Sequence, residues 1–283
     1  MTSKLLKRMP AIIYGTAWKK ERTTDLVMVA VREGFRGIDT ACQPKHYRED
    51  LVGVALRNLF DEGIVNRDDM WIQTKFTPLD GQDISQPLPY DPKASLDEQI
   101  RQSLDKSIRN LGVDYLDSVI LHSPLPTKEE TLLAYRTLEE LADQGKVRTL
   151  GISNIYDPTL LQWLINEARI KVGVVQNRWY EGNGWDWPIV DMCLANDIRY
   201  QSFWTLTGSP TLIAHRRIYK IRRKYVCTPE QAIYKLAQAW GITPLCGATS
   251  LGHIQEAINS TEIHHIKADI PKAIELQQMM RRP

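Results

Sequence analysis

Short apolar runs alternate along the chain with longer segments in which apolar residues recur every three or four positions. A short apolar run bounded by turn residues is typical of a buried strand, whereas recurrence near every 3.6 residues indicates an amphipathic helix. The clearest helical segment is Ser95–Asn110, where Leu96, Ile100, Leu104 and Ile108 lie four residues apart. The pattern predicts a protein built from alternating strands and helices.

The alternation repeats eight times along the sequence. Strands are expected at Ala11–Thr16, Gly37–Thr40, Trp71–Lys75, Tyr115–His122, Arg148–Ile152, Val172–Gln176, Ile198–Thr205 and Ile242–Cys246. The helices that follow them are expected at Thr23–Glu33, Arg48–Asp61, Ser95–Asn110, Lys128–Gln144, from Asp157, at Trp187–Asn196, from Thr211 to Trp240 with a break near Pro229, and at Ser250–Asn259, before a last helix at Pro271–Met280. Eight such units favour a closed barrel over an open sheet. The sequence therefore predicts an α/β fold, a (β/α)8 TIM barrel with eight parallel strands, as one domain over residues 1–283.

The charge of the chain is nearly balanced, because 36 basic and 34 acidic residues give a net charge of +2. Such a chain exerts no strong field on nucleic acid or on an anionic membrane, and we expect neither as a partner. One local basic run covers residues 215–224. It is typical of the solvated face of an amphipathic helix, with a phosphate or partner contact as the alternative.

Cysteine usage and the first residues of the chain bear on its location. The four cysteines are far apart and form no CxxC pair, so the sequence predicts neither a metal site nor a disulfide framework. The first ten residues lack the apolar core of a signal peptide. No stretch approaches the roughly 20 apolar residues of a membrane span. We expect a cytoplasmic protein with reduced thiols, as a monomer or weak oligomer.

Polar side chains follow consecutive strands at the ends that parallel strands present to one face of a barrel. Asp39 ends the second expected strand, Lys75 the third and His122 the fourth, and Tyr47 comes eight residues after Asp39. Taken singly, each has a structural explanation, as a turn residue, a solvated lysine or a core histidine. Together, at the face where barrels carry their chemistry, they favour an active site.

The four side chains form a chemically consistent set. A free tyrosine titrates near about 10, and a nearby ammonium stabilises the phenolate, so we expect Lys75 to lower the pKa of Tyr47. Asp39 would keep Lys75 charged, and His122 would orient a carbonyl or help to share the proton. Such a site protonates an oxygen while hydride reaches the carbon. The hydride requires a cofactor, because no side chain can supply it.

Several segments of the chain resemble the aldo-keto reductase family, in particular its fungal-type members. In chain order, the similar segments are GFRGIDTACQPKHYREDLVGVAL, WIQTKF, DSVILHSP, LGISN, VVQN and GATSLGHIQEAI. The resemblance extends from about Ala11 to Ser260. The four polar residues in this order are a specific signal, whereas any one segment alone is a weak one.

The resemblance implies a barrel that binds NADP(H) in extended form, and the chain has no GxGxxG motif of a Rossmann fold. It implies that Tyr47, Asp39, Lys75 and His122 form a catalytic tetrad. The cofactor contacts that it implies are Asp39; Ser153, Asn154 and Gln176 at the nicotinamide carboxamide; Phe203 stacked on the nicotinamide ring; Leu206 and Thr207 below the pyrophosphate; and Ser250, His253 and Glu256 at the adenosine end.

Three departures from the family pattern bear on cofactor and substrate. Gly247 and His253 stand where many members place the lysine and arginine that bind the 2′-phosphate of NADP(H). We expect NADP(H) as the favoured cofactor, with NAD(H) as the alternative and with charge supplied by His253 and by Arg222 or Arg223. The long loop at residues 77–92 is expected to cover the substrate site. The chain ends soon after its last expected helix, which predicts an open pocket for a bulky carbonyl compound such as a secondary metabolite.

Three side chains are expected to line the substrate site. Trp18 follows the first expected strand and Trp179 follows the sixth, so either ring would form a wall of the pocket. His46 lies beside Tyr47 and would face the substrate. The alternatives are core packing for the tryptophans and a loop position without a role for His46.

The leading interpretation is an NAD(P)H-dependent oxidoreductase that reduces an aldehyde or ketone to an alcohol, with Tyr47 as the proton donor. Three alternatives keep the same barrel. The first is an enzyme in which Lys75 forms a Schiff base with its substrate, as in aldolases. The second is a non-catalytic regulatory subunit that senses nicotinamide nucleotides. The third is a non-redox enzyme that catalyses a dehydration or rearrangement. The sequence names no substrate.

Overall fold

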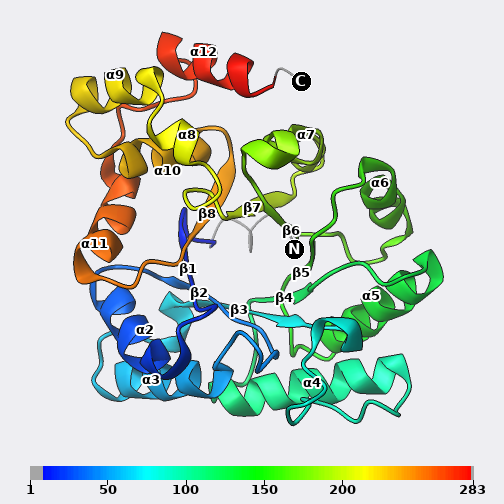
Figure 1. Ribbon diagram of the computed structural model, residues 1–283. Helices are drawn as coiled ribbons and strands as arrows, with labels where there is room; N and C mark the ends of the chain where they lie inside the picture. The colour runs from blue at the N-terminus through cyan, green and yellow to red at the C-terminus, as the bar shows by residue number, and fades with distance from the viewer. Residues whose placement is uncertain (1–8, 282–283) are drawn as a thin grey trace.

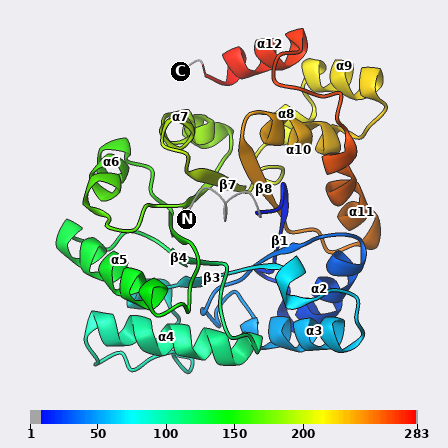
Figure 2. The same cartoon turned by 180° about the vertical axis from the view of Figure 1, so that it is seen from behind.

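The computed structural model describes residues 9–281 and contains a closed barrel of parallel strands surrounded by helices (Figures 1 and 2). The strands are β1 (Ile13–Gly15), β2 (Gly37–Asp39), β3 (Trp71–Phe76), β4 (Ser118–Leu121), β5 (Leu150–Ser153), β6 (Val174–Arg178), β7 (Arg199–Phe203) and β8 (Ile242–Cys246). Each strand pairs with the next in chain order, and β8 pairs with β1 to close the barrel. The predicted (β/α)8 fold is confirmed.

Helices connect the strands and form the outer layer. The α-helices are α2 (Thr23–Arg32), α3 (Glu49–Asp61), α4 (Leu96–Leu111), α5 (Lys128–Asp143), α6 (Pro158–Glu167), α7 (Trp187–Ala195), α8 (Pro210–Ile213), α9 (Arg216–Tyr225), α10 (Pro229–Ala239), α11 (Leu251–Asn259) and α12 (Pro271–Met280). The 3-10 helices are η1 (Lys20–Arg22), η2 (Arg67–Asp69), η3 (Leu79–Gly81), η4 (Glu181–Asp186) and η5 (Ser260–Glu262). Figure 1 shows α12 beside α9 at the edge of the barrel.

The expected elements occur in the expected order, and their ends differ by a few residues. The fourth strand is shorter than expected, because Leu116 forms only an isolated bridge with Val147. The sixth strand runs on to Arg178, two residues past its expected end. The sequence pattern also missed η4, where three residues adopt left-handed backbone angles: Gly184 (φ 60°), Trp185 (φ 53°) and Asp186 (φ 51°).

Close packing of α3 against α4 holds the segment that carries Tyr47. A Cβ atom at Gly53 would lie only 1.9 Å from the Asn110 carbonyl oxygen, so only glycine permits this approach. At the start of α3 the buried Glu49 carboxylate accepts hydrogen bonds from Thr74 Oγ1 (2.5 Å) and Asn110 Nδ2 (3.2 Å). The turn before α3 is thereby tied to both β3 and α4.

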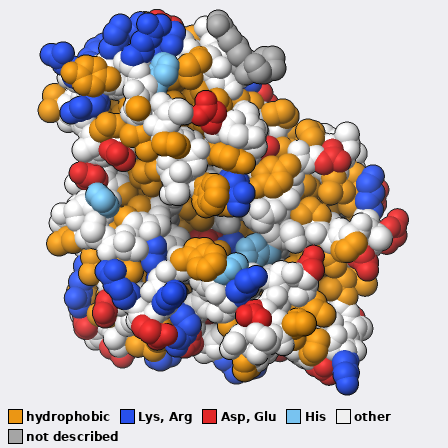
Figure 3. Space-filling view, in the orientation of Figure 1, with side chains coloured by type: hydrophobic (Ala, Val, Ile, Leu, Met, Phe, Trp, Pro, Cys, Tyr) orange, Lys and Arg blue, Asp and Glu red, His pale blue; other side chains and the backbone are white. Residues whose placement is uncertain are grey.

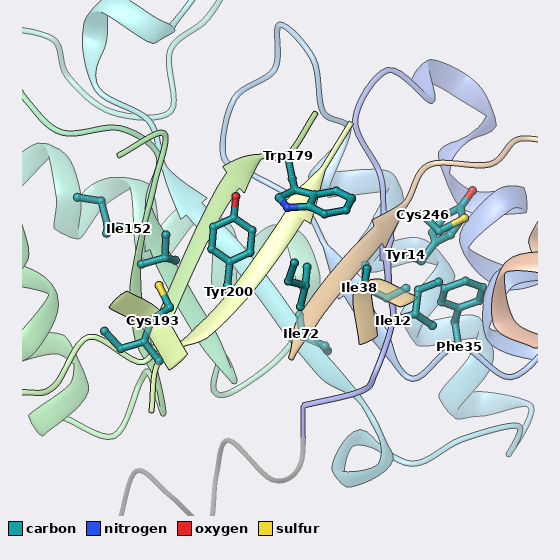
Figure 4. Packing of buried hydrophobic residues seen from close by; sticks show 14 of the residues in the cluster. Ile12, Tyr14, Phe35, Ile38, Ile72, Ile152, Trp179, Cys193, Tyr200 and Cys246 are labelled. Carbon is teal, nitrogen blue, oxygen red and sulfur yellow. The ribbon is translucent and has the colours of Figure 1, made fainter. Parts of the chain in front are cut away.

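Apolar side chains pack between the barrel and its helices, and Figure 4 shows part of this core. Amide side chains lie inside the barrel. Gln201 Oε1 accepts hydrogen bonds from Gln73 Nε2 (2.8 Å) and Gln176 Nε2 (2.9 Å). The same two donors also reach Asp39 Oδ1, so this buried amide group supports the carboxylate that ends β2. Within residues 9–281, no helix combines the length and the apolar character needed to cross a membrane.

Candidate active site

The four residues predicted as a tetrad lie at one end of the barrel because all strands run parallel. Asp39 is the last residue of β2, Lys75 lies near the end of β3, and His122 follows β4 directly. Tyr47 lies in the turn before α3. The structure brings these four side chains together.

Asp39 and Lys75 form a buried ion pair. Lys75 Nζ lies 2.6 Å from Asp39 Oδ2, and the two residues are 1% and 2% exposed, respectively. Lys75 also donates to the Thr40 carbonyl oxygen (2.9 Å). Asp39 Oδ1 accepts from Gln73 Nε2 (2.8 Å) and Gln176 Nε2 (2.9 Å). Buried charges persist when they are paired and hydrogen-bonded in this way.

The electrostatic balance keeps Lys75 charged. Burial by itself would lower the pKa of Lys75, but the Asp39 carboxylate and the Tyr47 phenol raise it above its ordinary value. A positive charge therefore stands next to Tyr47, whose ring centre lies 5.0 Å from Lys75 Nζ.

Tyr47 differs from expectation in the direction of its pKa. Burial raises the pKa of Tyr47, the charge and hydrogen bond of Lys75 lower it, and Asp39 raises it; the net result lies above the ordinary value. The expected lowering by Lys75 is present but is outweighed by burial, which the sequence does not reveal. The correction has a simple consequence: the phenol holds its proton at neutral pH.

His122 is neutral and well oriented. Burial, together with the charges of Lys75 and His46, lowers the pKa of His122 well below its usual range. Its Nδ1 lies 2.6 Å from Thr77 Oγ1, and its carbonyl oxygen accepts from Asn154 Nδ2 (2.8 Å). The ring stands edge-on to that of Tyr47, with the two centres 6.2 Å apart.

The three residues predicted at the nicotinamide carboxamide adjoin the tetrad, and protein groups engage them. Ser153 Oγ donates to the Gln176 carbonyl oxygen (2.6 Å). Asn154, at a left-handed φ of 54°, donates to the His122 carbonyl oxygen, and Gln176 donates to Asp39. They are therefore positioned beside the proposed reacting centre, with several of their donors already used.

The loop after β7 contains the next predicted contacts. Phe203 ends β7 half-buried, Leu206 is half-buried and Thr207 is exposed. The guanidinium of Arg178 lies 4.0 Å from the ring centre of Trp204, which is 48% exposed and which the sequence reasoning did not assign to the site. The aromatic rings of Phe203 and Trp204 thus lie beside the cation of Arg178, which ends β6.

Ser250 ends the β8–α11 loop, and His253 and Glu256 lie in α11. Ser250 caps α11 by accepting a hydrogen bond from the His253 backbone, and the His253 side chain is exposed. The Glu256 carbonyl oxygen accepts from Gln231 Nε2 (3.1 Å). Gln231 also lines a surface hollow of about 340 Å³ with Arg222, Arg223, Val226, Cys227 and Thr228. The arginines expected to supply charge therefore share this hollow with Gln231, which bonds to α11.

Two further cations at this corner were missed by the sequence reasoning. Lys19 Nζ donates to the Gly247 carbonyl oxygen, and Arg22 donates to the Thr249 carbonyl oxygen (2.9 Å). A Cβ atom at Gly247 would lie 3.5 Å from Lys19 Nζ, so Lys19 occupies the space beside this glycine. Burial and the neighbouring Arg22 lower the pKa of Lys19. The only signal in the sequence was the group of basic residues among positions 19–22. These residues show no helical or strand periodicity that would predict where they lie in the fold.

The rings of Trp18 and His46 lie in close contact, tilted by 39° to each other. Their ring centres are 3.9 Å apart, and Trp18 N donates to the His46 carbonyl oxygen (2.7 Å). Trp18 is 65% exposed and His46 is half-buried. Both side chains are therefore accessible to a ligand. Figure 3 shows apolar and histidine side chains around a hollow near the centre of this face.

Trp179 does not lie where a pocket wall was expected. It is 0% exposed and packs edge-on against Trp187, with ring centres 6.3 Å apart. Figure 4 shows it among the buried residues near Tyr200. The extension of β6 places Trp179 directly after the strand, with its ring in the core. The structure therefore favours the core-packing interpretation.

The barrel and this arrangement of polar residues belong to a known class of proteins. A model of the aldo/keto reductase family matches residues 11–212. The chain belongs to this family. Aldo-keto reductase family 1 member C15 of Rattus norvegicus is 27% identical over 282 residues, which cover 88% of this chain and 82% of that protein. NAD(P)H-dependent D-xylose reductase of Pachysolen tannophilus is 28% identical over 194 residues, which cover 60% of this chain and 55% of that protein.

Solved structures share the fold. The aldo-keto reductase AKR2E5 of the silkworm Bombyx mori is 23% identical with a TM-score of 0.80, over 95% of this chain and 84% of that chain. An aldo/keto reductase from Brucella melitensis is 21% identical with a TM-score of 0.78, over 96% of this chain and 95% of that chain. At this level of identity the likeness supports the fold.

Proposed function

We propose that the protein is an NAD(P)H-dependent reductase that converts an aldehyde or ketone to an alcohol, with Tyr47 as the proton donor. The observation that carries the proposal is the buried Asp39–Lys75 pair beside a protonated Tyr47. A proton donor must hold its proton in the resting state and must release it when negative charge develops on the substrate oxygen. The raised pKa of Tyr47 meets the first condition, and the adjacent ammonium meets the second.

The chain offers groups suited to a nicotinamide dinucleotide. Phe203 provides a half-buried ring, Asn154 provides an amide, and Lys19 and Arg22 provide positive charge beside the β8–α11 loop. In the loop after β7, Ser209 Oγ is buried without a hydrogen-bond partner among the described residues, and a phosphate oxygen would satisfy it. The dinucleotide, when bound, supplies the hydride that no side chain can provide.

Relatives support NADP(H) as the favoured cofactor. A relative in Meyerozyma guilliermondii is named an NADPH-dependent D-xylose reductase, and one similar solved structure is an aldo-keto reductase complexed with NADPH. Lys19, Arg22 and the exposed His253 lie around the same loop and would together meet an extra phosphate. NAD(H) remains the alternative cofactor in the proposal, because Gly247 carries no charge of its own.

Each tetrad residue has a separate task in this proposal. Tyr47 gives its proton to the carbonyl oxygen, and Lys75 stabilises the phenolate that remains. Asp39 keeps Lys75 charged and in place through the 2.6 Å ion pair. Neutral His122 binds the carbonyl oxygen by a hydrogen bond and orients it toward Tyr47.

We further propose that the substrate is a small-molecule carbonyl compound with a bulky skeleton, such as a secondary metabolite, and that the protein is a cytoplasmic single-domain monomer or weak oligomer. The exposed Trp18–His46 pair and Trp204 would provide flat surfaces for such a substrate. Fluorescence titration with NADPH and with NADH, followed by turnover against a panel of aldehydes and ketones, tests the proposal. Tight nucleotide binding without turnover of any carbonyl compound would instead favour a nucleotide-sensing subunit.

The geometry argues against Lys75 as a Schiff-base nucleophile. That chemistry needs a neutral, accessible amine. Lys75 is 1% exposed, is paired with Asp39 and has a raised pKa. Treatment with borohydride in the presence of the carbonyl panel should therefore leave no covalent adduct on Lys75. An adduct at this residue would contradict the reductase proposal.

A further inference from the structure

Thr77, two residues after Lys75, makes a partly buried contact with the imidazole of His122. Thr77 is 3% exposed, and its Oγ1 lies 2.6 Å from His122 Nδ1. This is the only hydrogen bond of the Thr77 hydroxyl among residues 9–281. His122 Nε2 has no protein partner in the same part of the chain. The two nitrogens of this ring thus face different surroundings.

The direction of the hydrogen bond follows from counting protons. A neutral imidazole has one N–H donor and one acceptor nitrogen, and a hydroxyl has one proton to donate. If His122 Nδ1 donated to Thr77, the buried hydroxyl proton would have no acceptor among the described residues. If Thr77 donates to Nδ1, both groups are satisfied, and an unsatisfied buried donor is avoided. The proton of the ring then lies on Nε2.

The surroundings of Thr77 hold its side chain in this position. Its carbonyl oxygen accepts from Tyr90 OH (2.8 Å) and from Gln82 Nε2 (3.2 Å). A Cβ atom at Gly81 would lie 2.7 Å from Thr77 Cγ2, so the methyl group packs closely against that glycine. Threonine is stiff about χ1, and a fixed methyl group also fixes the hydroxyl. The loop that follows β3 therefore contacts the His122 imidazole through the Thr77 hydroxyl.

We propose that Thr77 is a positioning residue, whose hydroxyl donates to His122 Nδ1, keeps the ring proton on Nε2 and so presents His122 as a hydrogen-bond donor to the substrate carbonyl oxygen. The part concerning substrate rests on the proposed function. With the other tautomer, Nε2 would carry a lone pair and would repel the oxygen of a carbonyl group. The Thr77 hydroxyl thus decides whether His122 attracts or repels the substrate oxygen.

A matched pair of substitutions separates the hydroxyl from the shape of the side chain. Thr77→Val keeps the branched shape and removes the donor, whereas Thr77→Ser keeps the donor and removes the methyl group. A hydrogen bond contributes about 0.5–1.5 kcal/mol net, which corresponds to roughly a 2- to 12-fold change in an equilibrium constant. We expect Thr77→Val to lower kcat/KM for a carbonyl substrate by about 5- to 10-fold, and Thr77→Ser to stay within about twofold of the wild type.

The tautomer itself can be read without substrate or cofactor. Long-range proton–nitrogen NMR of protein labelled with ¹⁵N-histidine distinguishes the protonated nitrogen from the bare one, and a His122→Gln variant identifies the His122 signals. We expect the wild type and Thr77→Ser to show Nε2–H, and Thr77→Val to show a mixture of tautomers.

Each outcome bears on a separate claim. A wild-type spectrum with Nδ1–H would overturn the proposal, as would an unchanged tautomer and unchanged kcat/KM in Thr77→Val. If Thr77→Val does not fold, the wild-type spectrum still decides the direction of the hydrogen bond. If the tautomer is as expected but the wild type reduces no carbonyl compound, the proposed function fails while the assignment of the Thr77 hydrogen bond stands.

Discussion

Asp186 offers a prediction whose size can be worked from its surroundings. This residue is 5% exposed, and its Oδ2 accepts from Asn177 Nδ2 (2.8 Å) and Tyr200 OH (2.9 Å). Burial raises the pKa of Asp186 from 3.8 to about 7, although Asn177 and Tyr200 oppose the rise. The difference of about three pKa units corresponds to about 4 kcal/mol at 1.36 kcal/mol each.

The sign of the effect follows from proton binding. The folded state holds the Asp186 proton more tightly than the unfolded state, so this group favours folding most at low pH. Its contribution is fully present below about pH 4, is lost as pH rises, and levels off above about pH 7. We predict that the free energy of unfolding of the wild type falls by about 4 kcal/mol relative to Asp186→Asn across this window.

The assay is urea unfolding of the wild type and Asp186→Asn at closely spaced pH values between 4 and 8. Asparagine suits this position because it tolerates the left-handed φ of 51° and carries no charge. Asp61→Asn, which removes an exposed carboxylate from α3, serves as the matched control. A difference between wild type and Asp186→Asn that does not change with pH would refute the reasoning.

Two further sets of substitutions test the electrostatics of the site. Lys75→Met should destabilise the fold by about 3–5 kcal/mol, because it leaves the Asp39 carboxylate buried and unpaired, and the double variant with Asp39→Asn should recover part of this loss in urea unfolding. A double variant no more stable than Lys75→Met would contradict that explanation. Lys19→Ala and Arg22→Ala should each raise the Kd of NADPH about tenfold or more while changing that of NADH less, as measured by fluorescence titration. Equal losses for both nucleotides would place these cations at a phosphate that NADH also carries.

The fold and the tetrad could be predicted because each rests on order along the chain. Strand and helix periods alternate, and in a parallel barrel the ends of successive strands meet at one face. Asp39, Lys75 and His122 follow from that rule without knowledge of distances. Tyr47 was accessible through the resemblance of the surrounding segment, although its separation from Asp39 is longer than in many family members.

What the sequence missed depends on contacts between distant segments. The direction of the pKa of Tyr47 is set by burial, which outweighs the neighbouring ammonium. Lys19 reaches Gly247 over 228 positions of sequence, and no local pattern signals this contact. The burial of Trp179 depends on where β6 ends and on the irregular turn of η4. Left-handed angles at non-glycine residues such as Asp186 are likewise imposed by tertiary packing.

The central claim is that Tyr47 protonates a carbonyl oxygen with the help of the neighbouring Lys75. Single-turnover reduction of an aldehyde by NADPH-loaded protein, compared between the wild type and Tyr47→Phe, tests it most directly. We predict that the substitution slows the chemical step by about 10²- to 10⁴-fold and leaves the Kd of NADPH within about threefold, because only the proton donor is removed. Turnover of Tyr47→Phe near the wild-type rate would contradict the account.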